Sequence, residues 1–140
     1  MRTSAVVLCG SLLALLPAPI VKGEIPEAAR QDPRHALGYV VVTHYPGVRP
    51  DGQGDSARGI QAAIEDAYAN HLAVLFPAGT YLISDTLKCY EWNVWNPPRK
   101  RAKNPDRRNH ILVGSTLGDT RPLIRLRPNS PAFADPEKPR

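Results

Sequence analysis

The sequence predicts one modest, mainly β domain that contains a single amphipathic helix. The chain has 15 prolines in 140 residues, which argues against a helical bundle because each proline inside a helix costs about 3 kcal/mol. Its hydrophobic fraction of 42% is too high for a disordered chain. Its apolar runs are short and mostly β-branched, and only one of them has helical spacing. Strands and loops should therefore dominate the fold.

Residues 1–23 have the pattern of a secretory signal peptide. Arg2 precedes an apolar run at residues 5–16, and two prolines follow it. The run is too short to span a bilayer, so we expect no stable membrane insertion and favour a cleaved signal over an uncleaved anchor. Small residues favour cleavage after Gly23, with cleavage after Ala18 as the alternative. The protein is therefore expected to be secreted or periplasmic.

The rest of the chain divides into short elements. Residues 24–37 contain two prolines and no periodicity, and they predict an extended arm. The predicted strands are short apolar runs bounded by glycine or proline: residues 39–43, 73–76, 80–83, 111–113 and 123–126. The run at 73–76 is continuously apolar, which predicts burial on both faces. Residues 128–140 contain four prolines and predict an irregular tail.

Residues 57–69 are predicted to form the helix. The apolar residues at helical spacing are Ile60, Ala63, Ile64, Ala67 and Tyr68. Asp55 or Ser56 can cap the first turn, a contribution of about 1 kcal/mol, and Asn70 is placed to end the helix in a left-handed conformation. Gly59 costs up to about 1 kcal/mol relative to alanine at a helical position.

Three motifs carry a family resemblance. They are GVRPDGQGDS at residues 47–56, IQAAI at 60–64 and FPAGTYLI at 76–83. Together they resemble the N-terminal part of pectate-lyase-superfamily proteins of the rhamnogalacturonase and epimerase-like kind, over residues 40–87. The sequence departs from that pattern at Pro46, where the family often has phenylalanine, and at Val48, Ser56 and Ala57. Ser56 retains the capping chemistry of the aspartate that it replaces.

The resemblance implies a right-handed parallel β-helix, in which each coil buries its apolar face against the next. Residues 38–127 would then be the capping helix and first coils, and residues 128–140 would lead into coils absent from this chain. Members of the family include polysaccharide lyases, hydrolases and epimerases whose catalytic groups generally lie in later coils, so we assign no catalytic residue. The full-length protein would be a polysaccharide lyase or glycoside hydrolase if it is catalytic. The alternatives are a non-catalytic carbohydrate-binding or structural β-helix module and a small independent secreted domain.

Candidate metal and acid–base chemistry is sparse. Asp51, Asp55 and Asp66 could be interpreted as a carboxylate cluster, but turn and cap roles explain the first two, and Asp66 is expected on the polar face of the helix. The four histidines show no ligand spacing and are expected to be surface or turn residues, and we expect no metal or cofactor. Cys89 is the one cysteine of the predicted mature chain, and we favour a buried small apolar residue over a reactive thiol.

Residues 88–110 combine aromatic and cationic side chains. Residues 99–108 hold six basic groups and one acid, a local charge of +5, whereas the predicted mature chain sums to +3. The basic charge is therefore one local feature, which disfavours a nucleic-acid surface. Rings beside cations suit polysaccharide, especially an anionic one, through stacking and charge-assisted hydrogen bonds. The predicted binding residues are Trp92, Trp95, Arg99, Arg101 and Arg107. The alternative is a solvated insertion with the tryptophans packed at its base.

Overall fold

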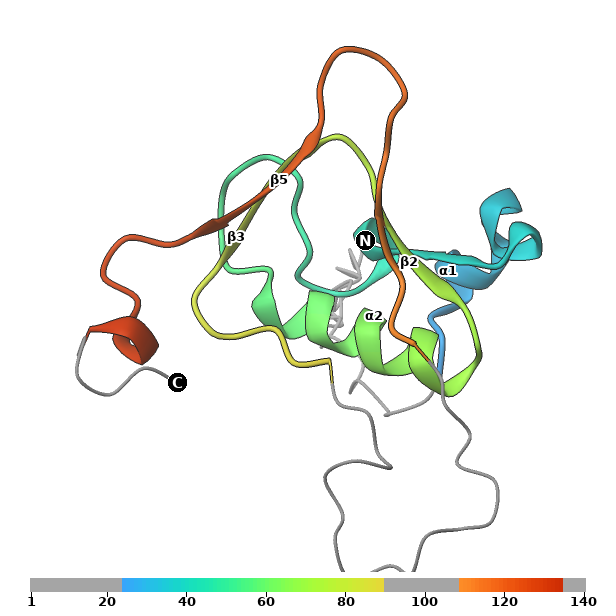
Figure 1. The fold of residues 1–140 in the computed structure, drawn as a ribbon, viewed down its shortest axis with the longest axis horizontal. Coiled ribbons are helices and arrows are strands. Elements are labelled where there is room, and N and C mark those ends of the chain that lie inside the picture. Colours follow the sequence, from blue (N-terminus) through green and yellow to red (C-terminus); the bar gives the residue numbers. More distant parts are fainter. Residues whose placement is uncertain (1–23, 90–108, 135–140) are drawn as a thin grey trace, which may run out of the picture.

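A computed structural model describes residues 24–89 and 109–134 of the chain. The described elements in chain order are α1 (Glu27–Gln31), the 3-10 turn η1 (Pro33–Leu37), β1 (Tyr39–Val41), the 3-10 turn η2 (Val42–His44), α2 (Ala57–Ala69), β2 (Ala73–Phe76), β3 (Gly79–Ile83), β4 (Leu112–Gly114), β5 (Pro122–Leu126) and the 3-10 turn η3 (Pro131–Phe133). The described residues form small parallel sheets with few helices (Figure 1), which agrees with the predicted mainly β class. The predicted signal peptide lies outside the described residues. None of the helices in the described ranges is long and apolar enough to cross a bilayer.

The strands form two small parallel sheets. One has the order β1-β2-β4, and the other pairs β3 with β5. The chain therefore passes twice from the first sheet to the second, through β2 and β3 and then through β4 and β5. Val74 pairs with Leu112 in the first sheet, and Tyr81 pairs with Ile124 in the second. The second pass thus lies in register on the first.

The loop at residues 50–56 closes one edge of the second sheet. The Thr80 amide donates to the Pro50 carbonyl, and the Gly52 amide donates back to the Thr80 carbonyl, both at 2.8 Å. The Ser56 amide donates to the Leu82 carbonyl at 2.8 Å. These bonds engage the Thr80 amide and the Thr80 and Leu82 carbonyls, which β3 does not use in pairing with β5.

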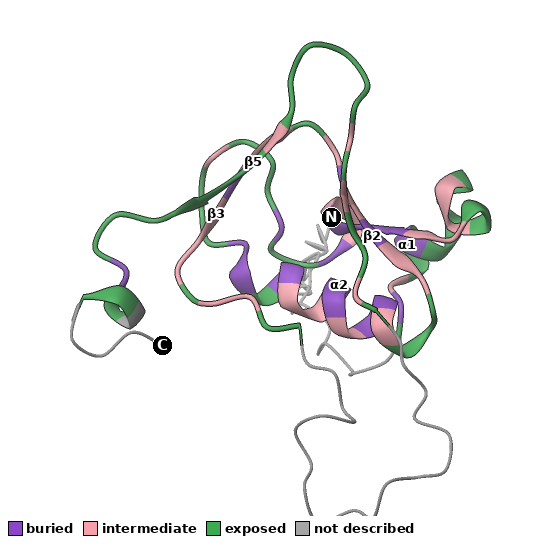
Figure 2. Ribbon diagram, viewed as in Figure 1, coloured by how far each residue is buried: buried purple, intermediate pink, exposed green. Residues whose placement is uncertain are grey.

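The opposite end of the stack is open. Along the inward-facing ladder of the first sheet, the exposed fraction is 0% at Val40 and 2% at Val74 but 42% at Leu112. In the second sheet it rises from 0% at Tyr81 to 41% at Ile124. Figure 2 shows β5 mostly in the colour of exposed residues. Within the described ranges, no strand pairs with the outer edges of β4 and β5. The molecule is therefore closed at the first pass and uncovered at the second.

Helix α2 packs against β1 and β2 of the first sheet. Ile60, Ala63 and Ile64 are fully buried, and with Ala67 they join the core that includes Val40, Val74, Phe76 and Tyr81. Burying an isoleucine side chain contributes about 1.5 to 3 kcal/mol, so this stripe anchors the first pass. The observed bounds, Ala57–Ala69, are those that the apolar spacing predicts.

Gly59 lies where α2 touches the preceding loop. A Cβ at this position would lie 2.5 Å from Val48 Cγ2 and 2.6 Å from the Pro46 carbonyl oxygen. Such distances are well inside van der Waals contact, so no larger residue fits without movement. The glycine that weakens helix propensity therefore permits the close packing of α2.

The two ends of α2 differ in detail from expectation. Asp55 Oδ1 accepts a hydrogen bond from the Ala57 amide at 3.0 Å, whereas the Ser56 hydroxyl accepts one from the Arg49 amide at 3.1 Å. Of the two predicted caps, Asp55 is therefore the one that satisfies a helix donor. At the other end Asn70 has φ −105°, and His71 takes the left-handed conformation with φ 58°. The prediction for Asn70 was wrong by one residue: His71 takes the left-handed position, and the Leu72 amide closes the helix end on the Ala67 carbonyl at 2.9 Å.

Residues 24–37, expected as an extended arm, are largely helical. Ala29 in α1 is fully buried and packs with Ile25 in the core. Asp32 caps η1: its carboxylate accepts the Arg34 amide at 2.9 Å and the Arg34 guanidinium at 2.6 Å, and it lies 2.8 Å from His44 Nε2. The segment is therefore tied to η2 and packed on β1, and the expectation of an extended conformation was wrong.

The strand predictions hold with small shifts at their ends. The strand predicted at 39–43 stops at Val41, since Val42–His44 turns as η2. The strand predicted at 111–113 is Leu112–Gly114, and β3 and β5 each begin one residue early. The run at 73–76 alternates between buried and half-buried, so it is not buried on both faces. The irregular tail contains the turn η3.

Candidate functional site

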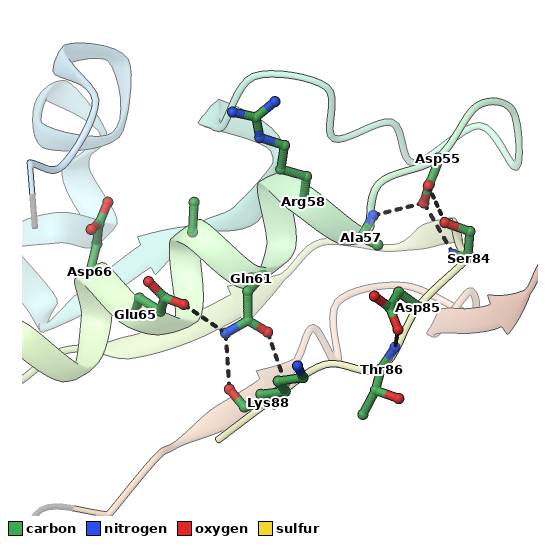
Figure 3. A pocket seen from close by; sticks show the side chains of 11 residues that line it. Asp55, Ala57, Arg58, Gln61, Glu65, Asp66, Ser84, Asp85, Thr86 and Lys88 are labelled. Atoms are coloured by element: carbon green, nitrogen blue, oxygen red, sulfur yellow. Dashed lines mark hydrogen bonds between the residues drawn. The ribbon is translucent and has the colours of Figure 1, made fainter. Parts of the chain in front are cut away.

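The larger described pocket lies between helix α2 and the segment that follows β3 (Figure 3). Its volume is about 650 Å³. Polar and charged side chains dominate its lining: Asp55, Arg58, Gln61, Glu65, Asp66, Ser84, Asp85, Thr86 and Lys88. Such a lining is typical of a site for a polar ligand, or of a polar joint that holds two segments together.

Asp55 closes one end of this pocket. Its carboxylate accepts the Ala57 amide at 3.0 Å, the Ser84 amide at 3.2 Å and the Ser84 hydroxyl. Burial raises the pKa of Asp55, but these hydrogen bonds outweigh it and leave the pKa below its ordinary value. The carboxylate therefore stays ionised and links the start of α2 to the end of β3. This geometry agrees with the predicted capping role of Asp55.

Gln61 joins the helix to the segment beyond β3. Its amide nitrogen donates to the Lys88 carbonyl at 3.0 Å, and its amide oxygen accepts the Lys88 amide at 2.8 Å. The same nitrogen donates to Glu65 at 3.1 Å. One side chain thus satisfies both backbone groups of Lys88, as a neighbouring strand would. Sequence reasoning assigned Gln61 no role, and its place in the IQAAI motif is the only signal that pointed to it.

Asp66 was expected on the polar face of α2, and this expectation was wrong. Asp66 is only 1% exposed. The core residue Tyr45, which lies near it, is 3% exposed. Burial raises the pKa of Tyr45, and the nearby negative charge of Asp66 raises it further. The apolar spacing could not reveal this, because position 66 lies at the border of the buried stripe and pairs with a tyrosine distant in sequence.

The predicted carboxylate cluster does not form a metal site in the described part of the chain. There, no group of three or more histidine, cysteine, aspartate or glutamate side chains could hold an ion. Asp51 accepts the Gln53 amide at 2.8 Å, as expected of a turn aspartate. Asp51 and Asp55 therefore have structural roles, whereas Asp66 is buried in the helix.

The predicted sugar-binding residues, Trp92, Trp95, Arg99, Arg101 and Arg107, all lie outside the described residues. The structure does place the residues that flank them. Lys88 is held by Gln61, and the His110 ring stacks on Tyr68 with centroids 4.4 Å apart. Gln61 and Tyr68 are two turns apart on α2 and so share one face. The chain leaves and rejoins the described structure over that face of the helix.

Cys89 and the histidines differ from expectation in part. Cys89 is exposed, so the interpretation as a buried small residue was wrong. Partial desolvation still raises the pKa of its thiol, which keeps the reactive thiolate scarce near neutral pH. His44 and His110 have definite partners, Asp32 and Tyr68, whereas they were expected only as surface or turn residues.

Comparison with known proteins gives one match. Residues 39–104 match the family model described as "Rhamnogalacturonase A/epimerase, pectate lyase-like". This match confirms the resemblance to the pectate-lyase superfamily that the sequence motifs predict. The comparisons with curated proteins and with solved structures found no match. The matched span covers β1, the closing loop, α2, β2 and β3.

Proposed function

We propose that this chain is the N-terminal part of an exported right-handed parallel β-helix protein that acts on polysaccharide. In this proposal it forms the first coils and contributes no catalytic group of its own. The observation that carries the proposal is the asymmetry of the stack: loop 50–56 covers β3 on one side, and the inward-facing residues of β4 and β5 are exposed on the other.

The parallel register supports the β-helix architecture. A strand that returns parallel to its predecessor in the same sheet needs a crossover, and such crossovers are right-handed in nearly all known cases. The two passes repeat the same order of strands, as the coils of a solenoid do. Leu112 and Ile124 extend ladders that begin with fully buried residues. A further coil over β4 and β5 would bury them in the same way.

The family match supports polysaccharide as the substrate class, because its description names a rhamnogalacturonase. A lyase and a glycoside hydrolase are both compatible with that description. We assign part of the polysaccharide binding to five side chains whose rings and cations suit a polymer that carries carboxylates: Trp92, Trp95, Arg99, Arg101 and Arg107. Over this segment we expect a preference for anionic polysaccharide and no nucleic-acid binding.

The hydrogen bonds of the larger pocket support a structural role for it. Asp55 is engaged by Ser84 and Ala57, and Gln61 is engaged by Lys88. No histidine or cysteine is among the described residues that line this pocket, and the Asp55 carboxylate that accepts the Ser84 hydroxyl also accepts the Ala57 and Ser84 amides. These hydrogen bonds within the protein also favour the alternative function, a non-catalytic carbohydrate-binding or structural β-helix module.

Export is proposed from the first 23 residues. Cleavage after Gly23 gives a mature chain that begins at Glu24, and cleavage after Ala18 gives one that begins at Pro19. Amino-terminal sequencing of protein recovered from the medium or periplasm distinguishes the two. Full-length protein retained in the cytoplasm would contradict export.

Two assays on the purified protein test the polysaccharide function. We expect binding to polygalacturonate that weakens with salt, without the absorbance rise of an unsaturated lyase product and without new reducing ends. Reversing Arg99, Arg101 and Arg107 to glutamate should abolish that binding and leave the melting temperature unchanged. Robust turnover would contradict the non-catalytic role, and binding unaffected by both salt and the reversals would contradict the assignment of the site.

A further inference from the structure

A second pocket, of about 450 Å³, lies at the C-terminal end of α2. It forms where the start of β1, the turn into β2 and the segment before β4 meet. Figure 1 shows the segment before β4 running past this end of the helix. None of the roles described above uses this pocket. Its volume falls in the range of small-molecule sites.

Aromatic rings form the wall of the pocket. Tyr39 comes from β1 and Tyr68 from the last turn of α2. The Tyr68 ring is nearly parallel to the His110 imidazole, with an angle of 15° between the planes. The two stacked rings belong to segments far apart in the sequence. The fold itself therefore positions them, without a bound ligand.

The rim of the pocket combines apolar and hydrogen-bonding groups. Leu37 is 74% exposed and Ile111 is 54% exposed, and both line the pocket. His71, whose left-handed backbone turns the chain into β2, and Asn109 add an imidazole and an amide to the lining. Exposed leucine and isoleucine gathered at a hollow with polar groups are typical of a binding site.

The charge of the lining selects the class of ligand. Among the described residues around this pocket there is no aspartate, glutamate, lysine or arginine. The pocket therefore offers no ion pair to a carboxylate or a sulfate. It suits a neutral ligand with an apolar face for the rings and hydroxyl groups for His71, Asn109 and the tyrosine hydroxyls.

We propose that this pocket binds one neutral pyranose unit of a polysaccharide. The proposal rests on the proposed polysaccharide function and adds to it a neutral-sugar subsite made of described residues. The C–H face of the sugar would pack on Tyr39 and Tyr68, and its hydroxyls would exchange hydrogen bonds with His71 and Asn109. Binding through neutral contacts would depend little on salt, in contrast with binding through the arginines.

The test is calorimetric titration of the purified protein with cellohexaose, xylohexaose, β-1,4-galactohexaose and hexagalacturonate. We expect at least one neutral hexasaccharide to bind with an affinity that salt hardly changes, and its binding to shift the ring-proton resonances of His71 and His110. Tyr68→Ala should weaken this binding at least about tenfold, whereas Tyr68→Phe, which keeps the ring, should retain most of it. Arg58→Ala, in the larger pocket, is the matched control and should leave it unchanged.

A second variant guards against a failure of Tyr68→Ala to fold. His71→Gly suits the left-handed backbone and should leave the melting temperature unchanged or higher, while it removes the imidazole and weakens the neutral sugar. Binding of hexagalacturonate alone would overturn this subsite and leave the polysaccharide function standing. Neutral-sugar binding that Tyr68→Ala and His71→Gly both leave unchanged would also overturn the subsite. Binding of none of the four sugars would overturn the subsite and contradict the polysaccharide function as well.

Discussion

At the scale of single residues, a few positions fix how the segments of this protein meet. Gly59 lets α2 approach the Pro46–Val48 loop, Asp32 ties the N-terminal turns to η2, and Asp55 joins the start of the helix to the end of β3. The residues that sequence reasoning placed correctly act locally: Asp51 in its own turn and Asp55 at the adjacent helix end. Asp66 and Cys89 were misplaced because their surroundings are set by segments distant in sequence, which no local pattern records.

Gly59→Ala separates packing from helix propensity. Alanine gains up to about 1 kcal/mol as a helix former, but its Cβ would collide with Val48 and Pro46, and such overpacking costs about 1 to 3 kcal/mol. We therefore expect a lower free energy of unfolding in urea. The exposed neighbour Arg58→Ala should change it by only a few tenths of a kcal/mol. A stabilised Gly59→Ala protein would show that the loop does not press on the helix.

The lowered pKa of Asp32 predicts how the stability of the protein depends on pH. The Arg34 guanidinium that hydrogen-bonds this carboxyl holds its pKa well below the ordinary value, and His44 lowers it further. A pKa depressed by folding means that the stabilisation is complete above the unfolded pKa of about 3.9 and is lost as the pH falls toward the folded pKa. Asp32→Asn should therefore lower the melting temperature at neutral pH and flatten its fall in acid.

The control for Asp32 is Asp119→Asn, at an exposed turn. It should leave both the melting temperature at neutral pH and its pH dependence close to those of the parent protein. If Asp32→Asn melts like the parent across the acid range, the cluster of Asp32, Arg34 and His44 does not hold α1 and η1 to the core.

At the scale of elements, α2 organises the molecule. Its apolar stripe packs against β1 and β2, and the flank that carries Gln61 and Tyr68 holds Lys88 and His110. The bounds of this helix could be predicted because spacing and capping act within a dozen residues.

The strands could be located, but their pairing could not be predicted, because parallel pairing joins residues separated by long crossovers. The helical form of residues 27–37 was missed because Asp32 and burial of Ala29, rather than periodicity, stabilise it.

Gln61→Ala tests whether the helix anchors the segment beyond β3. The change removes both hydrogen bonds to the Lys88 backbone, so the Lys88 amide should exchange with solvent markedly faster. The global melting temperature should fall little, because the side chain adds little to the core. Arg58→Ala, which lies in the same pocket but forms none of these bonds, should leave the exchange of Lys88 unchanged. Unchanged exchange in Gln61→Ala itself would mean that other contacts hold this segment.

At the scale of the whole molecule, the stack has a closed end and an open end. The family motifs predicted its beginning well because they encode the closing loop, the helix and the first pass, all within residues 40–87. The family resemblance led us to expect further coils, but the sequence could not show which residues are exposed, since Leu112, Ile124 and Leu126 have the pattern of ordinary core residues of short strands. The exposure of their side chains in the fold supports the proposal of a further layer over β4 and β5.

Amide hydrogen exchange along β3 and β5 tests this asymmetry most directly. In a parallel ladder alternate residues point their amides to opposite sides. The Arg127 amide donates to Ile83, so the amides of Leu123 and Arg125 face β3, and those of Ile124 and Leu126 face the open side. We expect slow exchange at Thr80, whose amide is held by Pro50, and at Tyr81 and Ile83, whose amides face β5, and we expect alternating slow and fast exchange along β5. Uniform protection of Ile124 and Leu126 in dilute monomeric protein would contradict the open end and the proposal that further coils are needed to cover it.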